Sequence, residues 1–422
     1  MKELFDRSKE VMPPEERTRY LDDKAKWIVD YAYRNAPGVK KRLDKAGVKP
    51  SQINCLKDLE RIPVLTKSEL LDLQRANPPF GGFLAVPLET LRRVFISPGP
   101  LYDALGTSWD LQIVAKTFFA AGFRKGDIVI NTFSYHLVPA GLLLDEGLKE
   151  LGVMVIPAGT GNSELQVQIM RELGITAYAG TPSFLKTLID RAEGKGYDFR
   201  QEFKLKRALL AAEMLPPSLR ETFENDYGID VFQAYGTADL GLAGYECGEK
   251  SGMHIPEEMI MEIVDPATGK QLGPGEMGEV VITTLNEIYP LIRFGTGDLS
   301  YYTDEPCPCG RTSDRLVRIT GRVGDAVKVR GMFIHPRQVE EALSKFSQVS
   351  NFQVIVTRAK HRDEMRLKLE LDEEVVDKEK LLEPVQDAIR EVCKLKMDKI
   401  DFVLSGTIPK ERKVILDERT WE

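Results

Sequence analysis

Short apolar runs alternate with helix-like segments from about residue 92 to residue 300, and this pattern constrains the fold more than any other feature. Parallel strands joined by crossover helices produce this order, so the sequence predicts an α/β fold with doubly wound, mostly parallel sheets. The expected strands are Arg93–Ile96, Asp127–Thr132, Val153–Pro157, Ala177–Gly180 and Arg207–Ala212, and the expected helices are Leu111–Ala121, Ala140–Leu151, Ser163–Leu173, Pro182–Ala192 and Pro217–Tyr227. Ligands of such sheets bind at the carboxyl ends of the strands. The loops expected there carry Ser97, Thr181, Glu213 and Asp239.

The segments on either side of this region follow other patterns. Residues 17–80 read as helical, and Thr66-x-x-Glu69 resembles a helix-capping box. After residue 245, the runs Met259–Val264 and Gly278–Thr284 are separated by the turn-rich DPATGKQLGPGE, which predicts antiparallel strands in a β-rich subdomain at about residues 245–320. The last hundred or so residues read as hairpin, helix, strand, strand, helix and strand. We therefore expect a large domain at residues 1–323 and a small α+β C-terminal domain at residues 325–422.

Composition excludes several classes of function. Lys and Arg number 58 against 65 Asp and Glu, and a formal net charge of −7 is unfavourable for neutralising the phosphates of a nucleic acid. No apolar run approaches the roughly 20 residues of a membrane span, and the charged N-terminal sequence lacks the apolar stretch of a secretory signal. Five Cys in 422 residues are too few for a disulfide scaffold. We expect a cytoplasmic protein that binds neither nucleic acid nor membrane, and the sequence leaves homodimer formation open.

A set of short motifs occurs in one order in the second half of the chain. They read YGTAD at 235–239, RFGTGD at 293–298, GRVGD at 321–325 and RGMFIHP at 330–336. Together they resemble the adenylate-forming superfamily of acyl-CoA ligases. The segments NPPFGGFLAVP, AGTGNSELQVQIM, GTPSFLKTL, CPCGRTSDRLVRITGR and PRQVEEAL narrow the resemblance to phenylacetate-CoA ligase and its relatives, over nearly the whole chain.

The resemblance implies a reaction in two steps. The carboxylate of an acid, aryl or small, attacks the α-phosphate of ATP to give acyl-AMP and pyrophosphate, and the thiol of coenzyme A then displaces AMP. A mixed anhydride carries a good leaving group that a free carboxylate lacks, and positive charge must offset the charge that develops on the phosphates. ATP, coenzyme A and a small-molecule acid are therefore the implied partners, and Mg²⁺ is the implied cofactor.

The resemblance also implies which residues hold the nucleotide. Asp298 matches the acidic residue that binds the ribose hydroxyls, and Arg322 matches the Arg that contacts ribose and phosphate. Glu213 matches a segment beside the adenine. Asp239 stands where relatives have a Glu that binds Mg²⁺, so its reach is shorter by one methylene, and a helix N-cap is the alternative for this residue. The remaining nucleotide-binding candidates are Ser97, Gly99, Ala212, Tyr235, Gly236 and Thr237.

Two segments depart from the family pattern. At 96–109, ISPGPLYDALGTSW, relatives carry a Ser/Thr/Gly-rich loop with a Lys that closes over the β- and γ-phosphates. Here only Ser97 and Gly99 survive, two prolines remove N–H donors, and no Lys follows until Lys116. The catalytic Lys that neutralises the α-phosphate is best matched by Lys413 in IPKERKVILDE, with Lys410 as the second choice. A Pro-rich turn and a solvated lysine are the alternatives for these two segments.

Other candidates concern the acid, coenzyme A and domain movement. Gly324 matches the hinge about which the small domain rotates between the two half-reactions, so the resemblance implies a mobile C-terminal domain, and a plain turn glycine is the alternative. The candidates for binding coenzyme A are Arg330, Gly331 and Pro336. The candidates for the acid pocket are Phe133, Tyr135 and His136. His136 is unusual there, and a core histidine is the alternative to one that pairs with the acid.

Cysteine spacing predicts a metal site of its own. Cys247-x6-His254 and Cys307-x-Cys309 each follow strand-like runs, and three thiols with one imidazole make a closed tetrahedral zinc set without an open catalytic position. Buried free thiols are the alternative, because C-x-C is tighter than the usual C-x2-C.

Two functions are compatible with these observations. The first is an AMP-forming acid–CoA ligase. The second is a member of the same fold that has lost adenylation and binds nucleotide or coenzyme A, which the altered loop, Asp239 and the short C-terminal segment would explain. A structural oligomer has little support, because the ligand-facing segments match the family best.

Overall fold

The computed structural model describes residues 3–97, 99–105, 111–323, 327–330, 332–334, 336–359, 362–371, 378–409 and 413–420. The chain divides into two compact units, Met1–Gly321 and Arg322–Glu422. The sequence placed this division at Gly324, a residue outside the described ranges.

Parallel strands form the centre of the first unit. Their order is β8-β7-β6-β4-β5, and each neighbouring pair is parallel. The strands are β4 (Ile128–Asn131), β5 (Met154–Pro157), β6 (Ala177–Gly180), β7 (Arg207–Leu210) and β8 (Asp230–Thr237). The connecting helices are α5 (Gln112–Ala120), α6 (Ala140–Glu150), α7 (Ser163–Glu172), α8 (Pro182–Gly194), α9 (Phe199–Glu202) and α10 (Pro217–Glu221), which a π-turn at Thr222–Asp226 extends. The predicted α/β fold with a parallel sheet is confirmed.

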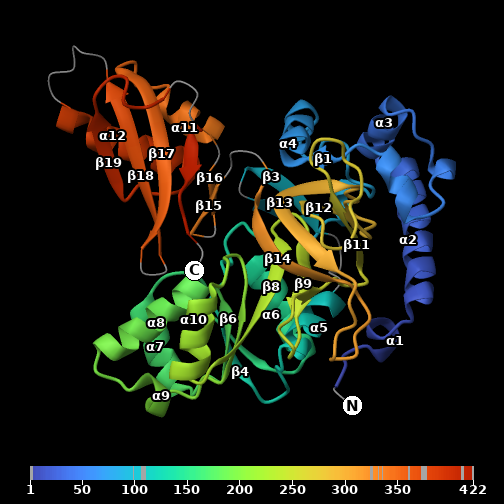
Figure 1. Cartoon of the computed structure of the whole chain (residues 1–422), viewed down its shortest axis with the longest axis horizontal. Helices are drawn as coiled ribbons and strands as arrows, with labels where there is room; N and C mark the ends of the chain where they lie inside the picture. The colour runs from blue at the N-terminus through green and yellow to red at the C-terminus, as the bar shows by residue number, and fades with distance from the viewer. Residues whose placement is uncertain are drawn as a thin grey trace. The chain divides into compact units, whose positions relative to one another are not determined.

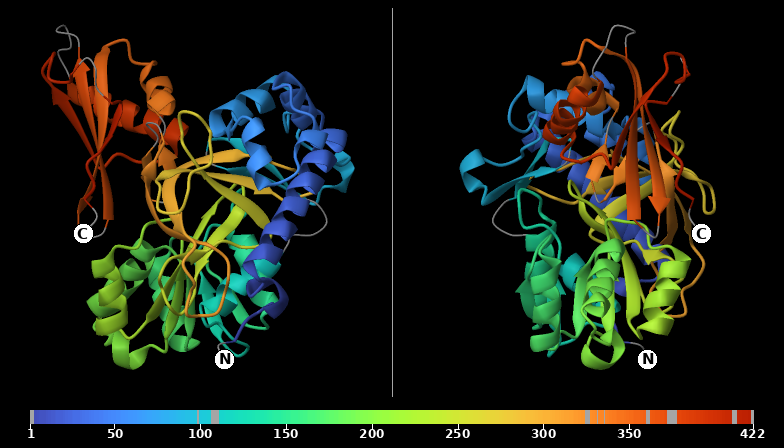
Figure 2. Two further views of the ribbon diagram at one scale, coloured as in Figure 1. Left: turned by 45° about the vertical axis from the view of Figure 1, so that its right-hand side comes forward. Right: turned by 90° about the vertical axis from the view of Figure 1, so that its left-hand side faces the viewer.

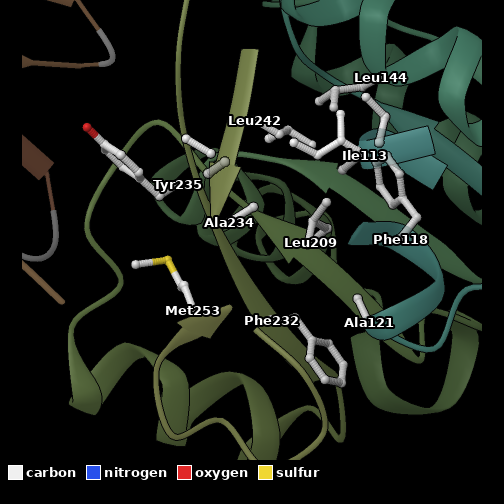
Figure 3. Close-up of a cluster of buried hydrophobic side chains, with 14 of the residues drawn as sticks. Ile113, Phe118, Ala121, Leu144, Leu209, Phe232, Ala234, Tyr235, Leu242 and Met253 are labelled. Carbon is white, nitrogen blue, oxygen red and sulfur yellow. The ribbon is translucent and has the colours of Figure 1, made fainter. Parts of the chain in front are cut away.

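Both faces of the inner strands β4, β6 and β7 are buried, which explains why these strands read as continuous apolar runs, whereas the edge strand β5 is partly exposed. Alternate side chains of a strand point to opposite faces, so Val129 and Leu209 pack with α5 and α6, whereas Ile130 and Leu210 pack with α7 and α8. Figure 1 shows these helix pairs on the two sides of the sheet. Figure 3 shows the cluster on the α5 and α6 side, where Phe118 and Leu144 face the strands.

The sheet continues beyond β8 with antiparallel strands. It reaches 12 strands in all, and its second part runs β8-β9-β10-β14-β13-β12-β11, with β1 (Leu65–Thr66) beside β13. These strands are β9 (Gly241–Glu246), β10 (Met253–His254), β11 (Met259–Val264), β12 (Gly278–Thr284), β13 (Phe294–Thr303) and β14 (Arg315–Arg322). The predicted antiparallel pair is confirmed, from Met259 opposite Thr284 to Val264 opposite Glu279.

One predicted strand of the parallel sheet lies elsewhere. β2 (Arg93–Ser97) pairs with β3 (Leu101–Leu105) in a two-stranded antiparallel ribbon, so the assignment of Arg93–Ile96 to the parallel sheet was wrong. The physical reason is that only one face of the run is buried, since Val94 is 46% exposed. A strand inside a parallel sheet is covered on both faces.

Helices precede the sheet, as the sequence predicted. They are α1 (Arg7–Glu10), α2 (Pro14–Asn35), α3 (Pro37–Lys45) and α4 (Lys67–Ala76), with 3₁₀ turns at Pro50–Gln52, Leu56–Arg61 and Leu88–Thr90. Figure 2 shows α2 as the long blue helix beside the antiparallel strands. Thr66 caps α4 by accepting a hydrogen bond from the Glu69 backbone N–H at 3.1 Å. The Glu69 carboxylate pairs with Arg42.

The second unit has its own sheet and core. The sheet order is β19-β18-β17-β20, and the helices α11 and α12 share its apolar cluster. Its elements are β15 (Val327–Val329), β16 (Met332–Ile334), α11 (Pro336–Leu343), β17 (Val349–Ala359), β18 (Arg362–Leu371), a 3₁₀ turn at Lys378–Leu381, α12 (Leu382–Cys393), β19 (Lys399–Val403) and β20 (Ile415–Asp417). The order matches the predicted α+β pattern with β20 added. Among the described residues, no helix has both the length and the apolarity to cross a membrane.

Candidate active site

A tyrosine and an aspartate from two strands of the large sheet, β8 and β13, form the centre of the site. Tyr235 near the end of β8 donates its hydroxyl hydrogen bond to Oδ2 of Asp298 on β13, at 2.9 Å. Asp298 is 8% exposed, and its backbone N–H donates to Oγ1 of Thr296 at 3.1 Å. In Figure 3 the Tyr235 hydroxyl points away from the apolar cluster. The pair therefore presents a fixed carboxylate, which can accept hydrogen bonds from ligand hydroxyls.

The two residues after Tyr235 shape the strand end. The register of β8 against β9 shifts between Tyr235 and Gly236, and a Cβ on Gly236 would lie 2.5 Å from the carbonyl oxygen of Gly241. Only glycine allows this approach of the two backbones. The Oγ1 atom of Thr237 is buried and has no hydrogen-bond partner among the described residues. A buried unpaired hydroxyl is costly unless a ligand or water completes it.

Asp239 lies in the turn between β8 and β9, beside the ribbon that begins with β2. Its Oδ1 accepts a hydrogen bond from Ser97 Oγ at 2.5 Å, and its Oδ2 accepts one from Lys67 Nζ at 2.9 Å. The alternative of a helix N-cap at Asp239 is wrong, because strand β9 follows. The structure thus brings together Ser97 and Asp239, as the sequence predicted, and adds Lys67 from the start of α4.

Lys116, the next lysine after the ribbon, serves another purpose. Its ammonium group lies 2.6 Å from Glu257 and 2.7 Å from Glu258, and its side chain is 1% exposed. Arg17 pairs with Glu257 at 2.7 Å. This buried ion cluster ties α5 to the N-terminal helices and to the segment before β11.

A second carboxylate lies on the same ribbon as Ser97. Asp103 on β3 is opposite Phe95, and Ser97 is opposite Leu101, so all four side chains share the buried face of the ribbon. Neither carboxylate oxygen of Asp103 has a hydrogen-bond partner among the described residues. Burial raises the pKa of Asp103 well above its usual range, and the nearby charge of Asp239 raises it further. Sequence reasoning missed Asp103, because it lies in the segment at 96–109 that departs from the family pattern.

The predicted adenine segment follows β7. Ala212 has φ of 69°, a left-handed conformation that is uncommon for a residue with a Cβ. An Oε2 atom of Glu213 accepts a hydrogen bond from the Ser183 backbone N–H at 3.3 Å, and Thr181 caps α8 by accepting one from the Phe184 N–H at 3.3 Å. The ends of β6 and β7 are thereby linked. Strained backbone of this kind clusters at functional sites.

A cavity of about 240 Å³ lies next to the predicted acid residues. It is lined by Tyr135, His136, Pro157, Ala158, Gly159 and Thr160. Asn131 at the end of β4 donates a hydrogen bond to the Tyr135 hydroxyl at 2.9 Å, which holds the ring in place. His136 is exposed, so the alternative of a core histidine is wrong. Phe133 is buried in the apolar cluster and is absent from the described lining of the cavity.

The other predicted residues lie at or beyond the end of the first unit. Arg322 ends β14, Pro336 begins α11, and the exposed Lys413 lies just before β20. Arg330 donates hydrogen bonds to the backbone oxygens of Asp363 and Lys396 and pairs with the Asp398 carboxylate, so it ties the second unit together. Gly324, Gly331 and Lys410 lie outside the described residues.

The predicted cysteine and histidine cluster is brought together. Cys247, His254, Cys307 and Cys309 are all buried, and their ligand atoms lie within 4.8 Å of one another. The sulfurs of Cys247 and Cys307 are 3.7 Å apart, and Cys309 Sγ is 3.4 Å from His254 Nε2. Tetrahedral zinc with bonds of about 2.3 Å separates neighbouring sulfurs by about 3.8 Å. Ser313 lies 3.2 Å from the other ring nitrogen of His254, a position that orients metal-bound imidazoles.

Comparison with known proteins identifies the family. The family models for the AMP-binding enzyme and for the AMP-binding enzyme C-terminal domain match residues 148–286 and 331–419. The chain is 34% identical over 377 residues to the phenylacetate-coenzyme A ligase of Thermus thermophilus, covering 86% of this chain and 83% of that protein. The chain belongs to the adenylate-forming acyl-CoA ligases, in the phenylacetate-CoA ligase-like branch. The ligase is also 33% identical over 362 residues to the phenylacetate-coenzyme A ligase of Pseudomonas putida, covering 83% and 80% of the two chains.

A solved structure agrees with this assignment. The ligase matches 2-hydroxyisobutyryl-CoA ligase in complex with 2-HIB-AMP and CoA in the thioesterification state, with a TM-score of 0.91 and 27% identity over 98% of this chain and 92% of that one. The ligase is therefore an enzyme that joins a carboxylic acid to coenzyme A with formation of AMP from ATP.

Proposed function

We propose that this ligase activates an aryl or small carboxylic acid as its adenylate at the end of strand β8, and then transfers the acyl group to coenzyme A. The observation that carries the proposal is the buried Asp298 carboxylate, which accepts a hydrogen bond from the Tyr235 hydroxyl at 2.9 Å. The turn that carries Asp239 joins two strands of the same sheet. The relatives named above act on phenylacetate and 2-hydroxyisobutyrate, which are both small acids. The cavity beside Tyr135 and His136 supports an acid of this size class.

In this proposal each residue has a chemical role. Asp298 accepts hydrogen bonds from the ribose hydroxyls, Arg322 contacts ribose and phosphate, and the backbone at Ala212 and Glu213 lines the adenine. The unpaired hydroxyl of Thr237 would be completed by the α-phosphate. Ser97, Gly99, Tyr235, Gly236 and Lys413 complete the nucleotide site.

The chemistry follows from these roles. A carboxylate oxygen of the acid attacks the α-phosphorus, the bond to the bridging oxygen breaks, and pyrophosphate leaves. The thiol of coenzyme A then attacks the acyl carbon, and AMP leaves with its phosphate charge offset by the protein. Mg²⁺ bound by the phosphates would reduce their charge, and the carboxylate of Asp239 is a hard oxygen donor suited to that ion. Arg330, Gly331 and Pro336 would line the path of coenzyme A after rotation at Gly324.

We also propose a structural zinc ion at Cys247, His254, Cys307 and Cys309. The short sulfur and nitrogen distances and the second-shell Ser313 support it. Because these thiols must stay reduced, a cytoplasmic location suits the protein. Homodimer formation remains a separate hypothesis that size-exclusion chromatography with light scattering can test.

ATP–pyrophosphate exchange with a panel of aryl and short-chain acids tests the proposed function. Exchange that depends on one acid and needs no coenzyme A would support adenylation at this site. Binding of AMP or coenzyme A without exchange by any acid would favour the alternative, a member of the fold that has lost adenylation.

A further inference from the structure

The segment between β2 and β3 lacks a lysine, yet a lysine from a distant segment lies against it. Lys67 Cε lies 3.2 Å from the position that a Cβ on Gly99 would occupy, and Lys67 Nζ lies 4.0 Å from it. The same Nζ is 2.9 Å from Asp239, and Ser97 is 2.5 Å from that carboxylate. A positive charge therefore stands beside the ribbon at the place where ATP phosphates would lie in the proposed site.

The position of Lys67 is fixed by two neighbouring elements. Thr66 pairs with Gly295 of β13 and caps α4, so that Lys67 is the first residue of this helix. The N-terminal end of a helix of this length favours negative ligands such as phosphate. The Lys67 side chain is 20% exposed, whereas that of Asp239 is 3% exposed. The Lys67 side chain is thus partly open to a ligand, whereas the carboxylate that it pairs with is covered.

The charges around Lys67 make it more than an ordinary surface ion pair. Asp103 and Asp239 are both buried, and the described residues give neither oxygen of Asp103 a partner. A triphosphate that enters beside the buried Asp239 carboxylate needs cations to offset the repulsion. In the absence of nucleotide, Lys67 is the counter-ion of Asp239. When ATP enters with Mg²⁺, the lysine is placed to turn from the carboxylate to the phosphates.

We propose that Lys67 is the phosphate-binding lysine of this ligase, contacting the β- or γ-phosphate of ATP in place of the lysine missing from residues 96–109. This inference rests on the proposed function, because it places ATP at the Asp298 site. It also gives a reason why adenylation survives in spite of the altered loop. Lys67 holds the leaving pyrophosphate and has no role once acyl-AMP has formed.

Binding measurements separate this role from a structural one. We would measure the affinities of the α,β-methylene analogue of ATP and of AMP, each with Mg²⁺, by calorimetry for the parent and for Lys67→Ala. A lost charge-assisted contact should weaken the ATP analogue by about 10- to 100-fold. AMP lacks the β- and γ-phosphates, so its affinity should change less than about 2-fold. Lys57→Ala is the control, because Lys57 is an exposed lysine paired only locally with Glu60.

Further variants keep the test decisive if Lys67→Ala folds poorly. Lys67→Gln keeps a polar side chain that is one atom shorter and uncharged, and it should lose analogue affinity. Lys67→Arg keeps the charge and should retain most of that affinity. Equal losses for AMP and the analogue, or no loss for either, would overturn the inference. ATP–pyrophosphate exchange by the parent enzyme distinguishes the two proposals. If the parent catalyses this exchange and Lys67→Gln catalyses it at the same rate, the Lys67 inference fails and the proposed function stands. If the parent binds the analogue in a Lys67-dependent way without exchange, the proposed function fails and the inference stands.

Discussion

At the scale of single residues, Asp298 is the group on which nucleotide binding depends most in this account. Replacing it with Ala should weaken binding of AMP by about 1.5–3 kcal/mol, because hydrogen bonds to a charged group contribute that much. Tyr235→Phe removes only the hydroxyl that positions the carboxylate, and we expect a loss of about 0.5–1.5 kcal/mol. Calorimetric titration with AMP measures both. Asp23→Ala, at a side chain that is 78% exposed, is the matched control. Unchanged AMP affinity in a folded Asp298→Ala would remove the residue from the site.

The sequence predicted site residues that belong to family motifs. It missed site residues that lie outside these motifs and reach the site only through tertiary packing. Asp298 and Tyr235, whose side chains contact each other, were predicted as nucleotide-binding residues because each belongs to a family motif. Lys67 lies 172 positions from Asp239, and the sequence signal at Thr66 and Glu69 concerned only the helix cap. Asp103 lies in the segment at 96–109, where the sequence departs from the family motif. Such contacts arise from tertiary packing, which a single sequence does not reveal.

At the scale of elements, the cluster proposed to bind zinc joins the end of β9 and strand β10 to the segment between β13 and β14. Ligase that is purified without a chelator should contain about one zinc ion per chain, as measured by elemental analysis. Cys309→Ser should lose the metal and lower the free energy of unfolding, while AMP affinity stays the same because a closed site has no place for substrate. Cys55→Ser is the control, since Cys55 lies outside the cluster. Protein without metal and with parent-like stability in Cys309→Ser would contradict the zinc site.

The buried ion cluster around Lys116 holds other elements in place. Lys116→Ala leaves Glu257 and Glu258 without their nearest cation, and we expect a loss of about 3–5 kcal/mol in the free energy of unfolding in urea. Burial raises the pKa of Glu257, but Lys116 and Arg17 outweigh this effect and lower it overall. A lowered folded-state pKa adds stability that is present above the ordinary Glu value of 4.5 and is lost as pH falls below it. Lys26→Ala is the exposed control. If the urea midpoint of Lys116→Ala equals that of the parent, Lys116 does not stabilise the buried ion cluster.

The bounds of the strands with two buried faces were predicted to within a few residues. The sheet to which β2 belongs was not predicted. β6 (Ala177–Gly180) agrees at both ends, because an apolar run bounded by turns leaves few alternatives. The run at Arg93 was assigned to the wrong sheet because pairing partners depend on which face is covered. That information lies in the packing and not in the local pattern.

At the scale of the whole molecule, the proposed reaction consists of two half-reactions, and Lys413 is assigned to the first of them. Lys413→Ala should suppress adenylation and spare thioester formation from a supplied acyl-AMP, because the charge of this lysine matters while the acid attacks the α-phosphate. Assays of the two half-reactions measure this division. Lys399→Ala, an exposed lysine of the same unit, is the control. Equal losses in both half-reactions would contradict the role of Lys413.

In the proposed reaction, the acid is activated when its own oxygen attacks the α-phosphorus of ATP. Ligation of an acid in which both carboxylate oxygens are ¹⁸O, followed by mass spectrometry of the nucleotide product, tests this step directly. Attack by the acid oxygen predicts one ¹⁸O in the phosphate of AMP for each acyl-CoA formed. The reason is that the bridging oxygen of acyl-AMP comes from the acid and leaves with AMP. AMP without the label, or ADP as the nucleotide product, would contradict it.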